Sequence, residues 1–170
     1  MRVAKRQLIQ SFADYVREVI GSSQLTFDNL REFITAQGGT LEFFDASQTK
    51  EKESVTKTAV DAFTIKLKQA NSEIPHKLSL AHEIGHLMLH MKLGTDAWND
   101  IAVGTAYTLK YTVCSISEDE ANEFAAALLL PEKNFTQAVR DAAADLKKLA
   151  ERFQVDESIV YYRGRSLNIW

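Results

Sequence analysis

The sequence predicts an α+β domain in which a small mixed or antiparallel sheet packs on helices. Three observations favour this class: helical periodicity at both ends of the chain, a few short alternating segments between them, and a composition of 45% hydrophobic and 25% charged residues. A chain of 170 residues is expected to form a single domain. We divide it into N-terminal helices with a first strand (1–57), a central core (58–131) and closing helices (132–170).

Two helices are predicted before the first strand. The first carries apolar residues at spacings of three and four. The residues expected on its buried face are Leu8, Phe12, Tyr15, Val16 and Val19. In the second helix Thr26 is the expected N-cap, Leu25 and Leu30 are placed as a hydrophobic staple, and Gly38-Gly39 ends the helix.

Short strands and loops are predicted for residues 40–68 and 94–116. Residues 40–45 are predicted to form a short strand, and the polar residues 46–57 an exposed loop or a ragged hairpin. Apolar and polar residues alternate over 62–68, which predicts a half-buried strand at an edge of the sheet. Residues 94–116 are expected to form a loop, with a candidate strand at 107–113.

The rest of the chain is predicted to be helical. One helix runs from about residue 77 to 92. Its expected buried face consists of Leu80, Ile84, Leu87 and Met91. A capping box opens a later, very apolar helix, with Ser117 as the N-cap and Glu120 three residues on, and Pro131 ends it. Two or three short helices finish the chain.

Charge and cysteine content exclude several classes of protein. The net charge of −3 argues against a strongly basic surface for binding nucleic acid. The lone Cys114 excludes an internal disulfide and every zinc site that needs two thiolates from one chain. The sequence starts without a signal-peptide pattern, and its longest apolar run, 124–130, is too short to span a bilayer. We expect a cytoplasmic protein with no membrane partner, and favour a monomer.

One motif carries chemistry. All four histidines lie between residues 76 and 90, and His82, Glu83 and His86 form an HExxH motif on the predicted helix. Residues four apart share a helix face, so both imidazoles can reach one zinc ion while Glu83 projects nearby. A catalytic zinc takes a third protein ligand and keeps its fourth position for water. The chain must supply that ligand from outside the motif.

Two sources of the third ligand can be set aside. The metzincin pattern is excluded because Leu89 and Lys92 stand where it requires Gly and His. His90 continues the face of the motif, but it lies about 12 Å along the helix axis from His82, at ~1.5 Å per residue. That is too far to share the metal, so we expect a structural role for His90.

The next helix offers three glutamates as the third ligand. Glu118 lies on the inward face of that helix, whereas Glu120 and Glu123 point about 200° and 140° around it from Glu118, at 3.6 residues per turn. We choose Glu118 and keep the other two as alternatives. Asn122, one turn later, is expected to accept a hydrogen bond from a ligand imidazole and fix its tautomer.

Two spaced motifs resemble the ImmA/IrrE family of bacterial and phage metallopeptidases. The first is LAHEIGHLMLH at 80–90, and the second is ExxANxFAAxLLLP at 118–131. Residues 149–155 also resemble the helices that close this domain. The family is of the gluzincin type, with two histidines and a downstream glutamate on zinc. The resemblance implies one Zn²⁺ per chain on His82, His86 and Glu118, in a short form without the C-terminal sensor domain.

Members of that family cleave, or promote cleavage of, a helix-turn-helix repressor of mobile-element or stress genes. The resemblance implies an intracellular zinc endopeptidase (a peptide-bond hydrolase) whose protein substrate is such a repressor. Zinc would lower the pKa of its water to about 7, and Glu83 would take the proton and pass it to the leaving amine. Tyr107 and Tyr111 are candidates for the oxyanion or substrate contact, and the strand at 62–68 is expected to align an extended substrate.

A second function remains open, that of a regulatory protein-binding or DNA-binding module, as in a toxin–antitoxin pair, with little or no proteolytic activity. The C-terminal helices, with Arg152, Arg163 and Arg165, are compatible with a helix-turn-helix. A helical hairpin that seals the core fits this acidic chain better, so we expect no direct nucleic-acid partner. Glu83 beside both histidines favours the enzyme, because a structural zinc site has no use for a general base. His76 is expected to be solvated.

Overall fold

The computed structural model describes residues 3–108 and 116–170. The helices of these residues are α1 (Val3–Ile20), α2 (Phe27–Ala36), α3 (Glu73–Leu89), the short 3₁₀ helix η1 (Asp96–Trp98), α4 (Ile116–Leu129), α5 (Glu132–Asp141), α6 (Leu146–Phe153) and α7 (Glu157–Ser166). The strands are β1 (Gly39–Phe44), β2 (Ser54–Ala59), β3 (Ala62–Lys68) and β4 (Ala106–Thr108). The predicted α+β class, with a helical C-terminus, is confirmed. Most of the candidate strand at 107–113, together with Tyr111 and Cys114, lies outside the described residues.

The sheet is mixed, with the strand order β1-β3-β2-β4. β1 runs parallel to β3, while β2 is antiparallel to both β3 and β4. The prediction that residues 62–68 form an edge strand is wrong, because β3 is paired on both sides. Alternation of apolar and polar residues indicates that one face of a strand is buried, but it does not indicate whether the strand pairs with one strand or with two.

The polar segment before β3 contains a strand. β2 and β3 form a hairpin whose register shifts between Lys57 and Ala59, so the ragged-hairpin interpretation holds for residues 54–57 of the segment 46–57. Lys57 is 2% exposed, and its Nζ donates to the carbonyl oxygens of Trp98 (2.7 Å) and Ile101 (2.9 Å). A lysine whose ammonium is satisfied by carbonyls can face the interior, which hydrophobic patterning does not detect.

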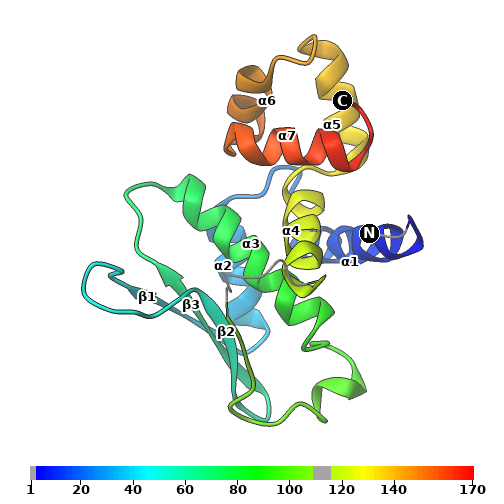
Figure 1. The fold of residues 1–170 in the computed structure, drawn as a ribbon. Coiled ribbons are helices and arrows are strands. Elements are labelled where there is room, and N and C mark those ends of the chain that lie inside the picture. Colours follow the sequence, from blue (N-terminus) through cyan, green and yellow to red (C-terminus); the bar gives the residue numbers. More distant parts are fainter. Residues whose placement is uncertain (1–2, 109–115) are drawn as a thin grey trace.

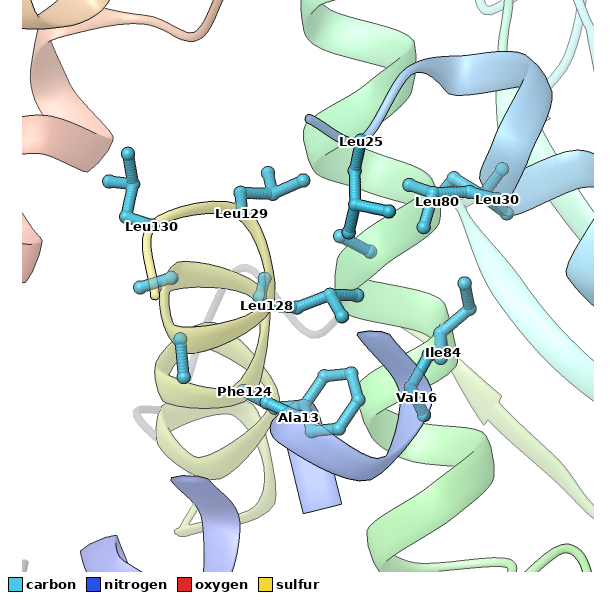
Figure 2. Close-up of a cluster of buried hydrophobic side chains, with 14 of the residues drawn as sticks. Ala13, Val16, Leu25, Leu30, Leu80, Ile84, Phe124, Leu128, Leu129 and Leu130 are labelled. Atoms are coloured by element: carbon cyan, nitrogen blue, oxygen red, sulfur yellow. The ribbon is translucent and has the colours of Figure 1, made fainter. Parts of the chain in front are cut away.

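The helices form a layer on one side of the sheet. Figure 1 shows α3 between the sheet and α4, with α5, α6 and α7 grouped at one end of the molecule. The shared core is drawn in Figure 2, where side chains of α1, α3 and α4 point toward one another. Its central members include Ala13, Val16, Leu80, Ile84, Phe124 and Leu128. No helix of the described residues has the length and apolar composition that crossing a bilayer requires.

The buried face of α1 differs from the predicted one. Ile9, Ala13 and Val16 are buried, whereas Leu8 and Tyr15 are more than half exposed. Val19 is also exposed, and Phe12 is only partly buried. Two apolar stripes run side by side along this helix, and α4 packs on the one that contains the small residue Ala13. Periodicity alone cannot choose between adjacent stripes.

Two helix starts also differ from prediction. α3 begins at Glu73 and includes Pro75 in its first turn, a position that tolerates proline because the first backbone N–H groups have no intrahelical partner. α4 begins at Ile116, so Ser117 lies inside the helix and is not its N-cap. Thr26 does cap α2, in a capping box with Asn29.

Candidate metal centre

Two imidazoles of α3 face the same point. His82 and His86 are one turn apart, and their Nε2 atoms lie 3.1 Å from each other. The side chain of His86 is 1% exposed and that of His82 10%. Burial and the proximity of His82 and His90 lower the pKa of His86 to about 3. His86 is therefore neutral near pH 7, the form in which histidine binds metals.

Glu118 of α4 completes a three-residue cluster. Its Oε2 lies 3.2 Å from Nε2 of His82, and its Oε1 lies 3.4 Å from Nε2 of His86. One potential ligand atom from each of the three residues lies within 4.8 Å of the others. Two imidazole nitrogens and one carboxylate converge from two helices in a largely buried position, where they could hold a metal ion. Catalytic zinc sites use the same set of donor atoms.

The other glutamates of α4 point elsewhere. Glu120 contacts His90 and forms an ion pair with Lys5 of α1. Glu123 is 1% exposed and accepts hydrogen bonds from Arg163 (3.2 Å) and Ser166 (2.9 Å). The structure therefore places Glu118, and neither Glu120 nor Glu123, beside both histidines of the motif.

The close approach of α3 and α4 brings these residues together. Gly85, inside the HExxH motif, faces Ala121 and Phe124 of α4. A Cβ at Gly85 would lie 3.1 Å from the Cα of Ala121, which is tighter than ordinary van der Waals contact. A glycine at this point lets the two helix backbones approach until Glu118 reaches the imidazoles.

Asn122, the residue expected to accept from a ligand imidazole, lies beside His82. Its Oδ1 lies 2.9 Å from Nδ1 of His82, at the side of the ring away from Glu118. An amide oxygen accepts, so Nδ1 of His82 carries the proton and Nε2 presents a lone pair. A lone pair 3.2 Å from a carboxylate oxygen is repulsive unless a proton or a cation lies between them. The residues present therefore fit a bound metal ion.

Glu83 lies in the interior beside this cluster. Its side chain is buried, and its Oε2 has no hydrogen-bond partner among the described residues. Burial raises the pKa of Glu83 well above its usual value, and the negative charges of Glu53 and Glu118 add to the effect. A raised pKa makes the carboxylate a stronger base, which suits general acid–base chemistry.

The remaining histidines and the candidate tyrosines have defined surroundings. His90 contacts His86 rather than solvent, with 2.9 Å between their Nδ1 atoms. Tyr107 of β4 stacks on His86 and His90, with ring centroids 5.4 Å and 5.3 Å apart. His76 was expected to be solvated, but it is partly buried: its Nε2 accepts from the backbone N–H of Ala70, and its ring packs on Phe27 and Phe43. Tyr111 lies outside the described residues.

A mixed sheet, an HExxH helix and a second helix that adds a glutamate define a zincin-like domain. Residues 36–164 match the family model of the IrrE N-terminal-like domain, peptidase family M78. The chain belongs to this family, which confirms the resemblance to ImmA/IrrE proteins. No curated protein matches the chain.

The fold is similar to that of a Mycobacterium tuberculosis transcriptional regulator of known structure. The TM-score is 0.64, the sequence identity is 18%, and the likeness covers 92% of this chain and 46% of that protein. The chain thus spans about half the length of the regulator. At this identity the likeness shows the fold alone.

Proposed function

We propose that this chain is a zinc-dependent endopeptidase of the gluzincin type. In this proposal His82, His86 and Glu118 bind one Zn²⁺, and Glu83 is the general base. The observation that carries it is the convergence of three ligand atoms within 4.8 Å beside Oε2 of Glu83, which is buried and has no hydrogen-bond partner in the described part of the chain. Membership of a peptidase family supports the same conclusion.

The chain's own residues divide the chemistry among them. A zinc ion in such a site supplies a Lewis acid for the scissile carbonyl and activates water near neutral pH. Glu83 takes up a proton on Oε2, which no group of residues 3–108 or 116–170 hydrogen-bonds, and returns it to the leaving amine; its raised pKa suits it to this step. Asn122 holds His82 with its Nε2 toward the ligand cluster. Tyr107, against the ring of His86, is the remaining candidate for an oxyanion or substrate contact.

We propose a protein regulator as the substrate, specifically a helix-turn-helix repressor of a phage or mobile element. The family implies a protein substrate, and the similar Mycobacterium tuberculosis protein is named a transcriptional regulator. Such a repressor places the enzyme in the cytoplasm, where it would act as a monomer. Alignment of substrate along residues 62–68 is not part of this proposal, because β3 is paired on both sides.

The alternative of a DNA-binding module receives less support. Arg163, one of three arginines considered for that role, is 1% exposed. Its guanidinium donates to Glu123 (3.2 Å) and to the carbonyl oxygen of Leu130 (3.0 Å). A buried and paired arginine cannot contact phosphates. Arg163 therefore joins α7 to α4 inside the protein and adds no positive charge to the surface.

The test is cleavage of a candidate repressor, encoded beside this gene, by purified zinc-loaded protein. Glu83→Gln should keep one zinc per chain and lose roughly 10²–10⁴-fold in cleavage rate, the usual contribution of a general base. Glu32→Gln, an exposed change on α2, is the matched control and should cleave like wild type. Cleavage by Glu83→Gln at the wild-type rate contradicts the hydrolytic mechanism. Binding of the repressor without cleavage by wild type supports the regulatory alternative.

A further inference from the structure

A chain of polar contacts leads from His86 away from the metal centre. Nδ1 of His86 lies 2.9 Å from Nδ1 of His90, and Nε2 of His90 lies 3.4 Å from Oε2 of Glu120. The other carboxylate oxygen of Glu120 pairs with Nζ of Lys5 on α1. The side chains of His90 and Glu120 are 11% and 9% exposed, so solvent contributes little to these contacts.

Only one arrangement of protons satisfies every contact while a metal is bound. His86 must present its Nε2 lone pair to the metal, so its proton is on Nδ1. That N–H donates to Nδ1 of His90, which must therefore be unprotonated. The proton of His90 is then on Nε2 and is donated to the Glu120 carboxylate.

We propose that His90 and Glu120 are positioning residues for the metal ligand His86. They fix its tautomer, hold its ring plane, and increase its basicity through a histidine-to-carboxylate relay. This inference rests on the proposed metal site and adds to it two residues that are not themselves metal ligands. A ligand imidazole whose second nitrogen is hydrogen-bonded to such a partner is a better and more rigid ligand.

The packing around His86 supports the same role. Tyr107 stacks on both His86 and His90, with interplanar angles of 22° and 27°. One tyrosine ring therefore covers the two histidines together and restricts rotation of both. His90 is also the C-cap of α3, and its backbone N–H donates to the carbonyl oxygen of His86.

The hydrogen-bond partners of the two ligand histidines therefore differ in strength. His82 donates to a neutral amide on the exposed residue Asn122, whereas His86 donates to an imidazole backed by a carboxylate. The relay also ties α1 to the metal centre, because Lys5 neutralises the far end of Glu120. We expect His86 to be the more strongly held ligand.

The experiment measures zinc affinity, by competition with a chromophoric chelator, for wild type and three variants. His90→Phe keeps a ring beside Tyr107 but cannot accept a hydrogen bond, and should weaken zinc binding 10- to 100-fold, as loss of such a partner typically does. His90→Gln retains an amide oxygen as acceptor and should recover most of that loss. Glu120→Gln should fall between wild type and His90→Phe. Asp119→Asn, the same charge change at an exposed neighbour, should bind zinc like wild type.

A second readout reports the tautomer of His86 directly. Nitrogen-15 NMR of the zinc-loaded protein should show His86 with its proton on Nδ1 in wild type and in His90→Gln, and a loss of this hydrogen-bonded signal in His90→Phe. Wild-type zinc affinity in His90→Phe, in a protein that remains folded by circular dichroism, would overturn the relay. Failure of wild type itself to bind zinc would instead overturn the metal site, so the two failures are distinguishable.

Discussion

Gly85 of α3 lies against Ala121 of α4 so closely that a Cβ on the glycine would be 3.1 Å from the Cα and 3.2 Å from the carbonyl oxygen of Ala121. The contact is between backbones, so no side-chain rotation can relieve it. It sets the distance between the helix that carries His82 and His86 and the helix that carries Glu118.

Gly85→Ala is expected to weaken zinc binding. Alanine favours the helix by about 0.5–1 kcal/mol over glycine, but overpacking of a tight contact costs about 1–3 kcal/mol. The second effect is the larger, and relief requires α4 to move by a few tenths of an ångström away from the histidines. Zinc affinity and the melting temperature should both fall. A variant with a higher melting temperature and unchanged zinc affinity would show that the helices are free to separate without loss of the site.

The burial of Lys77 leads us to expect that the free energy of unfolding rises at alkaline pH. Lys77 is 4% exposed, and Nζ donates to the carbonyl oxygens of Leu25 (3.4 Å) and Phe153 (3.1 Å). Burial lowers the pKa of Lys77 to about 8 from its ordinary value of 10.5. Between these values the unfolded chain holds a proton that the folded chain does not, so the free energy of unfolding should rise as the pH increases from 8 toward 10.5.

Denaturant unfolding at several pH values measures this effect. Lys77→Met should remove the rise in this interval, whereas Lys147→Met, at an exposed site on α6, should keep it. Parallel pH curves for wild type and Lys77→Met would mean that Lys77 is as well solvated in the folded chain as in the unfolded one.

The buried pair of Arg163 and Glu123 should stabilise the fold without affecting the metal. Both side chains are nearly inaccessible, at 1% and 2% exposure, and they join α7 to α4. Glu123→Gln leaves the buried guanidinium of Arg163 without its carboxylate, a change that costs about 3–5 kcal/mol. Arg163→Met should cost less, because Arg6 still lies 3.7 Å from the Glu123 carboxylate. The variants should unfold at lower denaturant concentration, while zinc affinity at a temperature where they are folded stays near that of wild type. A large loss of zinc affinity in the folded variants would make Glu123 part of the metal site.

The candidate metal centre could be predicted in outline because the residues that define it lie close together in the sequence or on a single helix. HExxH is contiguous, and its spacing alone places His82 and His86 on one face of a helix. Glu118 could be chosen because helical geometry separates it from Glu120 and Glu123 on the same helix. One potential ligand atom from each of His82, His86 and Glu118 lies within 4.8 Å of the others.

What could not be predicted depends on partners distant in sequence. The contact between His90 and Glu120 requires the packing of two helices, and the helical spacing of His90 indicated only that it could not reach the metal. Lys57 was assigned to a polar loop or hairpin because its satisfying carbonyls, on Trp98 and Ile101, lie some 40 residues away. On α1, Ala13 is buried and Tyr15 is exposed because α4 packs on the apolar stripe that contains Ala13. Hydrophobic periodicity does not indicate which of two adjacent stripes another helix will cover.

Zinc stoichiometry with Glu118→Ala tests the central claim most directly. Elemental analysis of purified wild type should give one zinc per chain, and X-ray absorption should report two imidazole nitrogens and carboxylate oxygen around it. Glu118→Ala should lose most of the metal after dialysis, while Glu32→Ala, an exposed change on α2, keeps it. One retained zinc per chain in Glu118→Ala, with an unchanged absorption spectrum, would contradict the assignment of His82, His86 and Glu118 as the metal centre.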